Sequence, residues 1–302
     1  LGAVASGEES IAISTDAEAS GDRGVAIGRF AEALVSNGTA IGASSNAEGD
    51  SSTAIGVFSN ALGDRSVAIG RSSEANSDFS IAIGRLSEAD GIEGIAIGNG
   101  SDADGVGSIA NGADSEATGD HTAIGDNSEA SGEGASAVGN SARASGDNAS
   151  AFGTRASATG DDSIAIGTLS TASGLRAIAN GYLSSASGES STATGARSQA
   201  SGNFSTATGS FSEASGDAST ATGYDSVASG LFGTSMGSGS IASGRQTIAV
   251  GAGSRAEANG AIAIGGDGDD MDSDGAVASG ENAIAIGIDV QATADNAVTH
   301  GA

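Results

Sequence analysis

A glycine recurs every 14 residues along this chain, where it closes a short segment that reads Ala-Ile-Gly or a close variant. With this glycine as position 0 of a repeat, the series runs in steps of 14 from Gly28 to Gly112 and again from Gly125 to Gly265. One step, between Gly112 and Gly125, is a residue short, and the step from Gly265 to Gly287 is eight residues longer. Such a period predicts a solenoid in which each repeat forms one coil and contacts only its neighbours.

Each repeat contains two pieces in which the residue types alternate with period two. The segment 81–84 reads Ile-Ala-Ile-Gly, and the segment 87–91 reads Ser-Glu-Ala-Asp-Gly. This period is typical of β-strands and differs from the 3.6-residue period of a helix. We therefore expect two strands of roughly five residues per coil, joined by tight corners at which glycine adopts a positive φ. The sequence predicts an all-β fold, a narrow parallel β-roll of about 21 coils.

Two rows of alanine identify the interior of this roll. Position −2 is alanine in nearly every repeat, as at Ala82 and Ala96, and so is position +5, as at Ala89 and Ala103. Serine recurs at position +3, as at Ser87. Positions that accept only small residues face one another across a narrow gap, because larger side chains do not fit there. We therefore place the alanine, serine and glycine rows inside the roll.

Isoleucine and valine occupy positions −3 and −1, on the opposite face of the first strand. Stacked outside the roll, they form an apolar stripe larger than a soluble monomer normally exposes. The same stripe on other copies of the chain is the simplest cover, which predicts a homo-oligomer. If the faces are reversed, with isoleucine inside, a monomer becomes possible. The predicted interface residues are Ile27, Ile55, Ile69, Ile83, Ile97, Ile166 and Ile264.

Charge and composition exclude several classes of function. The chain has 38 acidic and 11 basic residues, a net charge of −27, which disfavours nucleic acid and anionic membranes as partners. It has no run of about 20 apolar residues, so we expect no direct membrane insertion by this segment. There is no cysteine, and the two histidines lie in no nucleophile–base arrangement. We therefore predict a protein that is not an enzyme.

The eight extra residues after Gly265 form an acidic insertion. Asp270, Asp272, Asp274 and Glu281 follow the spacing D-x-D-x-D-G-x5-E, in which alternate carboxylates can converge on one Ca²⁺. Helices do not flank this insertion as they flank an EF-hand loop, and Glu281 falls on an acidic position of the ordinary repeat. A calcium site and a disordered acidic loop are therefore both open. The insertion divides the chain into a β-roll at 1–265, a loop at 266–275 and a continuing β-roll at 276–302.

Three further sets of residues have alternative interpretations. Acidic residues recur at positions +4 and +8, where they can bind cations or keep a solvent-exposed face soluble. Thr-Ala-Thr replaces Ile-Ala-Ile in three successive repeats, at 192–194, 206–208 and 220–222. This array could bind ice, or it could be a hydrated stretch of the oligomer interface. Asn111 and Asn180 interrupt the isoleucine row and could fix its register, like a buried asparagine in a coiled coil.

The repeat resembles a known family. The segment 163–174, with Ser163, Ile164, Ala165, Ile166 and Gly167 followed by Ser170, Ala172 and Gly174, is similar to the head repeat of trimeric autotransporter adhesins of the YadA-like type. The resemblance extends over essentially the whole chain.

This resemblance implies a left-handed parallel β-roll that trimerises and binds host, cell or abiotic surfaces. It implies a cell-surface location, with outer-membrane anchoring supplied by segments outside these residues. A structural segment of an extracellular or phage tail fibre and an ice-binding solenoid remain the alternatives. The ligand, whether protein, glycan or abiotic surface, cannot be identified from the sequence.

Overall fold

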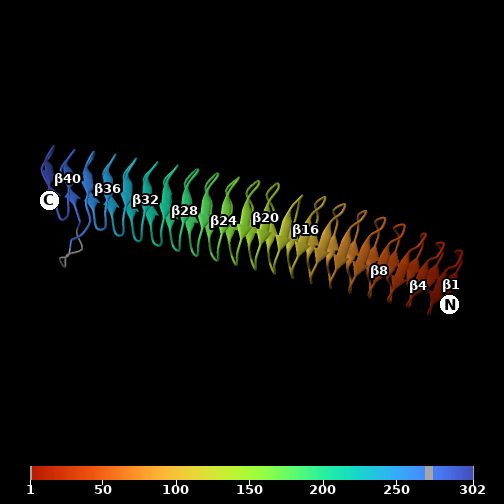
Figure 1. Ribbon diagram of the computed structural model, residues 1–302. Helices are drawn as coiled ribbons and strands as arrows, with labels where there is room; N and C mark the ends of the chain where they lie inside the picture. The colour runs from red at the N-terminus through yellow and green to blue at the C-terminus, as the bar shows by residue number, and fades with distance from the viewer. Residues whose placement is uncertain (1, 269–274, 302) are drawn as a thin grey trace. The chain divides into compact units, whose positions relative to one another are not determined.

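The computed structural model describes residues 2–268 and 275–301, and its fold is an all-β parallel β-solenoid of about 21 turns with a repeat of about 14 residues. This confirms the predicted class and period. The chain divides into two compact units, residues 1–148 (the first unit) and 149–302 (the second unit). Within each unit, every coil contributes one strand of three residues and one of two residues to two parallel sheets (Figure 1).

The odd-numbered, two-residue strands form the sheet that we call the short-strand sheet. In the first unit these strands are β1 (Val4–Ala5), β3 (Glu18–Ala19), β5 (Glu32–Ala33), β7 (Asn46–Ala47), β9 (Asn60–Ala61), β11 (Glu74–Ala75), β13 (Glu88–Ala89), β15 (Asp102–Ala103), β17 (Glu116–Ala117), β19 (Glu129–Ala130) and β21 (Arg143–Ala144). In the second unit they are β23 (Ser157–Ala158), β25 (Thr171–Ala172), β27 (Ser185–Ala186), β29 (Gln199–Ala200), β31 (Glu213–Ala214), β33 (Val227–Ala228), β35 (Ile241–Ala242), β37 (Arg255–Ala256), β39 (Val277–Ala278) and β41 (Gln291–Ala292).

The even-numbered, three-residue strands form the long-strand sheet. In the first unit these are β2 (Ile11–Ile13), β4 (Val25–Ile27), β6 (Thr39–Ile41), β8 (Thr53–Ile55), β10 (Val67–Ile69), β12 (Ile81–Ile83), β14 (Ile95–Ile97), β16 (Ile109–Asn111), β18 (Thr122–Ile124) and β20 (Ser136–Val138). In the second unit they are β22 (Ser150–Phe152), β24 (Ile164–Ile166), β26 (Ile178–Asn180), β28 (Thr192–Thr194), β30 (Thr206–Thr208), β32 (Thr220–Thr222), β34 (Thr234–Met236), β36 (Ile248–Val250), β38 (Ile262–Ile264), β40 (Ile284–Ile286) and β42 (Val298–His300).

The strands are shorter than the five residues that the sequence suggested, because two four-residue turns take up more than half of each coil. Corner one runs from position 0 to +3, and the N–H of the +3 residue donates to the carbonyl of position 0, as from Ser45 to Gly42 (3.4 Å). Corner two runs from +7 to +10 and closes in the same way, as from Ser52 to Gly49 (3.1 Å). The residues expected to extend the strands therefore lie in turns.

Glycine is favoured at the two corners for different physical reasons, and the sequence suggested only one of them. The position 0 glycine adopts a positive φ, +141° at Gly84, and a side chain there would also meet the backbone of Gly98 in the next coil. The +7 glycine, such as Gly91, does not adopt a positive φ, but a Cβ would meet the carbonyl of Gly105. The prediction of positive φ at both corners is therefore wrong for corner two, where close stacking of the backbones favours glycine.

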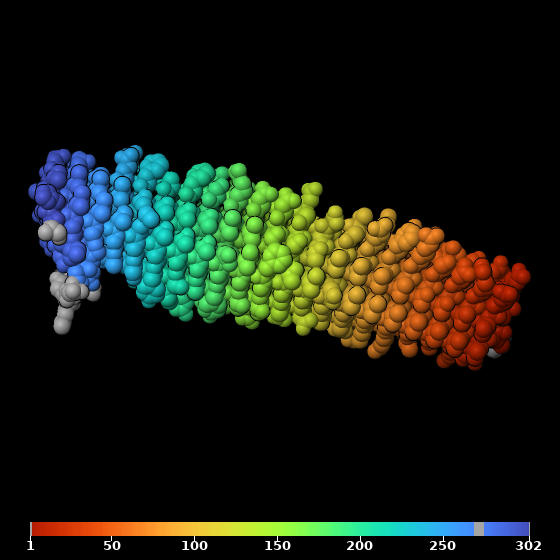
Figure 2. All heavy atoms as spheres, viewed as in Figure 1, coloured from red at the N-terminus to blue at the C-terminus, as the bar shows by residue number. Residues whose placement is uncertain are grey.

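The fully buried side chains of the interior are small, as predicted. The alanines at −2 and +5, such as Ala82 and Ala89, have no exposed surface, and the +3 serines such as Ser87 are equally buried. Thr247 is the largest fully buried side chain among the described residues. The two sheets therefore lie very close together, and the coils pack tightly along each unit (Figure 2). The isoleucines at −3 and −1 face outward, so the alternative with isoleucine inside is wrong.

The two irregular repeats leave the strand register intact. In the 13-residue repeat corner two loses one residue, and Ile109 still pairs with Thr122. His121 takes the +10 position there and is 7% exposed, with its Nδ1 3.2 Å from the carbonyl oxygen of Ala130. Across the long repeat, Ile262 pairs with Ile284. A change confined to a corner therefore does not disturb the sheets.

Candidate functional site

The outward side chains at −3 and −1 form two parallel columns on the long-strand sheet. Because the strands pair in register, each residue lies directly beside its equivalent in the next coil: Ile55 beside Ile69, Ile69 beside Ile83, and Ile83 beside Ile97. Stacking along the column leaves these side chains half-buried. The structure thus places Ile27, Ile55, Ile69, Ile83 and Ile97 in one column of the first unit. Ile166 and Ile264 occupy the same column position in the second unit, about 40% exposed.

A threonine window interrupts these columns in the second unit. Thr192, Thr206 and Thr220 pair in register at −3, and Thr194, Thr208 and Thr222 do so at −1. Asn180 lies beside Thr194 and is exposed. Hydroxyl groups therefore line three adjacent coils, and the Asn180 amide lines a fourth, on a face that is otherwise apolar. Water can hydrogen-bond these groups, so the window has less apolar area to bury than the isoleucine columns have.

Carboxylates form a continuous +4 row on the short-strand sheet of the first unit. Glu74, Glu88, Asp102 and Glu116 lie side by side in four successive strands. The pKa of Asp102 is raised to about 7 by partial burial, by a side-chain hydrogen bond with Asp104, and by repulsion from Asp104, Glu88 and Glu116. Partial burial, followed by repulsion from Asp90, Glu74 and Asp104, also raises the pKa of Glu88. Near neutral pH Asp102 therefore retains a proton that an isolated aspartate would release.

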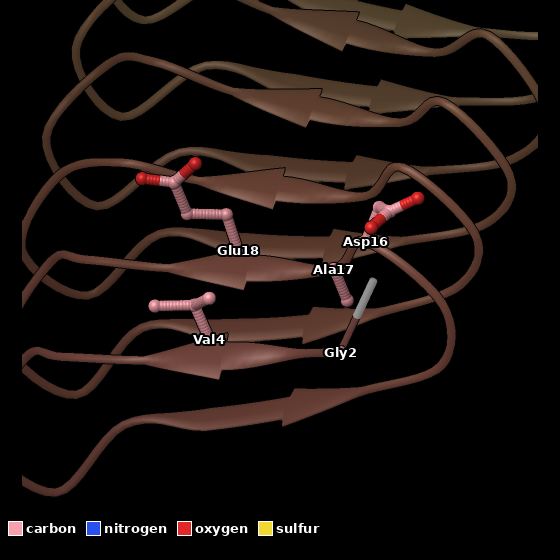
Figure 3. Close-up of a pocket in the computed structure, with 5 residues that line it drawn as sticks. All are labelled: Gly2, Val4, Asp16, Ala17 and Glu18. Atoms are coloured by element: carbon pink, nitrogen blue, oxygen red, sulfur yellow. The ribbon is translucent and has the colours of Figure 1, made fainter.

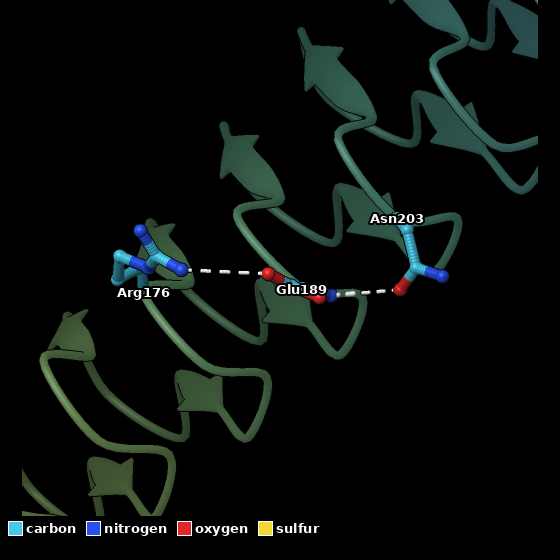
Figure 4. Close-up of polar contacts among 3 residues, drawn as sticks. All are labelled: Arg176, Glu189 and Asn203. Carbon is cyan, nitrogen blue, oxygen red and sulfur yellow. Dashed lines mark hydrogen bonds and ion pairs between the residues drawn. The ribbon is translucent and has the colours of Figure 1, made fainter.

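The +8 row has a structural role that was not anticipated from the sequence. In successive coils the backbone N–H of one +8 residue donates to the side-chain oxygen of the next: Asp50 to Asp64 (2.9 Å) and Asp64 to Asp78 (2.9 Å). In the second unit Glu189 N–H donates to Asn203 Oδ1 (3.0 Å), while the Glu189 carboxylate lies 3.4 Å from Arg176 (Figure 4). Asparagine serves as well as aspartate here, so the row supplies acceptors for turn amides rather than charge.

The predicted calcium site cannot be assembled from the described residues. Asp270, Asp272 and Asp274 lie outside them. Glu281 is described, and its backbone N–H donates to Asp295 Oδ1 (2.9 Å), the same bond that the other +8 residues make. Within residues 2–268 and 275–301, no group of three or more His, Cys, Asp or Glu side chains is arranged to hold a metal ion.

Two hollows lie at the first coils. One of about 390 Å³ is lined by Gly2, Val4, Asp16, Ala17 and Glu18 (Figure 3). The carboxylates of Asp16 and Glu18 point in different directions, so they do not converge on a common ligand. A second hollow of about 230 Å³ is lined by Glu8, Glu9, Asp22 and Arg23. Neither hollow brings together a nucleophile and a base.

The repeat geometry agrees with the comparison with known families. The model of the YadA head domain repeat, which describes two copies of the repeat, matches in overlapping segments from residue 5 to residue 298, interrupted only at 213, 241 and 268–273. The chain belongs to the YadA head repeat family. This confirms the resemblance that the 14-residue period suggested. A search among curated proteins found no relative that matches the chain.

Membership in the YadA head family accounts for the constant rows of the repeat. The family is a structural one and generally non-enzymatic. Among the described residues of this YadA head there is no helix that is both long and apolar enough to span a membrane. The alanine, serine and glycine rows build the roll and are the same throughout. What differs from coil to coil, and can therefore carry specificity, is the set of outward side chains.

Sequence analysis of this YadA head missed two features. The acceptor role of the +8 row could have been found, because Asn203 and Asn259 replace the acidic residue there and keep a side-chain oxygen without the charge. The positive φ of the non-glycine corner residues could not have been predicted from their residue types. They include Phe58, Leu86 and Phe211, residue types that rarely adopt this conformation.

Proposed function

We propose that this chain is the head of a trimeric adhesin, a roll whose long-strand sheet faces its counterparts on two other copies. Family membership over nearly the whole chain is the observation that carries the proposal. Heads of this family imply a left-handed roll, a trimer and a surface-exposed protein anchored in an outer membrane, and we extend these properties to this chain. Its role is to hold a binding surface away from the cell and attach it to an external ligand.

The isoleucine columns support this arrangement. The −1 column is isoleucine in every coil from Ile27 to Ile97, and stacking within one chain leaves these side chains only half-buried. Association through these columns would remove the remaining apolar surface from water, at about 25 cal/mol per Å². The short-strand sheet cannot serve in the same way in the first unit, because its +4 row carries carboxylates that would repel one another across an interface.

The mass of the purified segment tests the assembly. Sedimentation equilibrium should give about three times 28.3 kDa. The measurement is made in EDTA and again in Ca²⁺, so that an assembly dependent on calcium is recognised. Ile83→Asp places a charge in the column and should dissociate or unfold the assembly, whereas Glu88→Ala on the other sheet should leave the mass unchanged. An unaltered mass for Ile83→Asp would exclude the long-strand sheet as the interface.

Attachment is tested separately. Particles coated with the segment should adhere to surfaces that bare particles do not bind, and soluble segment should compete. A trimer that adheres to nothing in such a panel would favour the alternative of a purely structural fibre segment.

A further inference from the structure

The phenylalanines of this chain lie mostly at exposed corner positions and not in its interior. Of the seven, all of which lie in the described part of the chain, six are corner residues with φ between +57° and +61° and are 42–61% exposed. These are Phe30, Phe58, Phe79, Phe204, Phe211 and Phe232. The six lie at +2 or +9, and other coils place Asn127 at +2 or Asn37 and Gly107 at +9, residue types that adopt a positive φ more readily. Aromatic rings held in water at a strained backbone position indicate contact with a ligand.

One group of aromatic residues gathers on corner one of the second unit, and we call it the aromatic corner. It consists of Tyr182, Arg197, Phe211, Tyr224 and Asp225, from four successive coils. The backbones of these turns are bonded to one another: Arg197 N–H donates to the Tyr182 carbonyl (2.8 Å), and Asp225 N–H donates to the Ser210 carbonyl (3.0 Å). The aromatic corner is therefore a ridge of stacked turns with a fixed spacing.

The side chains of the aromatic corner are also ordered against one another. The Arg197 guanidinium lies 5.3 Å from the centroid of the Phe211 ring, in cation–π contact. The Phe211 and Tyr224 rings meet edge to face, with centroids 5.7 Å apart and planes at 70°. Even so, Tyr182 is 49%, Phe211 42% and Tyr224 59% exposed. A ligand would therefore meet rings that are already held in place, at a small cost in side-chain entropy.

The chemistry of the aromatic corner differs from that of the isoleucine columns. A purely apolar surface suits another copy of the chain, whereas here rings alternate with polar groups: two phenol hydroxyls, the Ser210 hydroxyl, the Arg197 guanidinium and the Asp225 carboxylate. Within the aromatic corner the one cation and one anion balance, and three of the four +4 residues in its coils, Ser185, Gln199 and Val227, are uncharged, while Glu213 is acidic. Exposed rings beside hydrogen-bonding groups of both kinds match a sugar, which presents apolar C–H faces and a rim of hydroxyls.

We propose that the aromatic corner is a binding site for uncharged glycans. The inference rests on the proposed adhesive function and names its ligand class. A pyranose ring lies against the exposed Tyr224 ring, with Asp225 beside it, and further sugars of the same chain reach Arg197 and Tyr182, which lie two and three coils away and exchange hydrogen bonds with the sugar hydroxyls. Because the site is a ridge, one site binds a single sugar weakly. The three copies in a trimer bind a polysaccharide much more tightly through avidity.

The composition of the chain supplies a selective probe. There is no tryptophan, and Tyr182 and Tyr224 are the only tyrosines, so the intrinsic fluorescence comes from this site alone. The assembled protein is titrated with neutral oligosaccharides of glucose, galactose and N-acetylglucosamine, and its binding to the corresponding immobilised polysaccharides is measured. We expect saturable fluorescence changes for at least one of them, retained in high salt because the ligand carries no charge.

Two variants separate the site from the fold. The double variant F211N/Y224S uses residues that occupy the same positions in other coils, so it should keep the mass and melting temperature of the assembly. It should lose polysaccharide binding by at least about tenfold, the loss of about 1.4 kcal/mol. The matched control Phe58→Asn removes an exposed ring at the same corner position of the first unit and should bind normally.

Three results would overturn the inference: no neutral glycan binds, only anionic glycans bind, or F211N/Y224S binds as the parent does. A fall in assembly mass for F211N/Y224S would also overturn it, because the aromatic corner would then be a subunit contact. If particles still attach to surfaces in any of these cases, the adhesive function stands without this site. If the segment attaches to no surface at all, the proposed adhesive function itself is contradicted.

Discussion

In the first unit the +4 row carries Glu74, Glu88 and Asp102 in consecutive coils, whereas in the second unit the same row carries Thr171, Ser185 and Gln199. Residues 1–148 contain 23 acidic and six basic residues, and residues 149–302 contain 15 and five, with five of those acids in the insertion. The −1 column differs in parallel, from isoleucine in the first unit to the threonine window in the second. Meanwhile the buried alanine and serine rows are the same in both.

The difference shows that the inward and outward rows are under separate constraints. An interior side chain meets the opposite sheet at once, so every coil needs the same small residues. An outward side chain meets only its equivalents in the two neighbouring coils, so each stretch of the roll can carry its own surface. Changes to inward rows should therefore act alike in both units, and changes to outward rows should act differently.

The largest loss of stability is expected for substitution of the position 0 glycine, which recurs in both units. Gly84→Ala and Gly209→Ala each force a side chain onto a positive φ and against the backbone of the next coil, at Gly98 and Gly223. We expect each to destabilise its unit by about 3 kcal/mol or more. The control Gly239→Ala has open space and should cost about 1 kcal/mol. Denaturant unfolding compares the three, and a tolerated Gly84→Ala would mean that the first unit stacks more loosely.

Substitutions in the outward rows should have different effects on the two sheets. Thr208→Ile places one isoleucine in the −1 column in the middle of the threonine window and should raise the melting temperature of the assembled protein, because it adds about 1 kcal/mol of apolar burial per subunit at the proposed interface. Gln199→Ile on the short-strand sheet is the matched control and should give no such gain. Thermal unfolding at several protein concentrations measures both melting temperatures. An equal gain for the two variants would contradict the assignment of the long-strand sheet as the interface.

The acidic row makes the stability of the first unit depend on pH. The pKa of Asp102 is about 7 in the folded chain, above its unfolded value near 4, so the folded state holds the proton more tightly. The contribution of this group to stability is therefore complete below pH 4 and is lost as the pH rises through 7. Asp102→Asn should remove this loss and stabilise the first unit at pH 8.

Hydrogen exchange at β15 and β29 measures this effect in each unit. Protection at β15 should fall between pH 4 and 8, after correction for intrinsic exchange, and Asp102→Asn should restore it. Protection at β29, where Gln199 occupies the same position, should not change. A β15 that is equally protected at both pH values would show that repulsion along the row is fully relieved by solvent and salt.

The smallest change in stability is expected for serine-to-alanine substitutions in the two buried serine rows, at +3 and +10, of one unit. Ser212 Oγ donates to the Gly209 carbonyl (2.8 Å), whereas Ser205 Oγ, at +10, has no hydrogen-bond partner among the described residues. Ser212→Ala should cost about 1 kcal/mol, and Ser205→Ala should be neutral or stabilising, because an unsatisfied buried hydroxyl is removed. Chemical denaturation gives both values. A loss at Ser205 equal to that at Ser212 would show that its hydroxyl is satisfied in solution.

The sequence by itself determined the class of fold, the coil length, the inward rows and the family. It could do so because these depend on the period: a 14-residue repeat with alanine at −2 and +5 favours an outward Ile83, although only the structure excluded the reverse arrangement. The same reasoning anticipated that Glu281 falls on a repeat position. The predicted strand lengths and the predicted positive φ of the corner-two glycine were wrong, because alternation of residue types does not show where a strand ends and a turn begins.

Only the tertiary structure decided which side chains meet across coils. Asp64 and Asp78 are 14 residues apart, and nothing local shows that one accepts the turn amide of the other. The raised pKa of Asp102 and the meeting of Arg197, Phe211 and Tyr224 arise in the same way. Periodicity fixes the direction in which a side chain points, but burial, ring geometry and hydrogen bonding depend on the neighbours that stacking brings within contact distance.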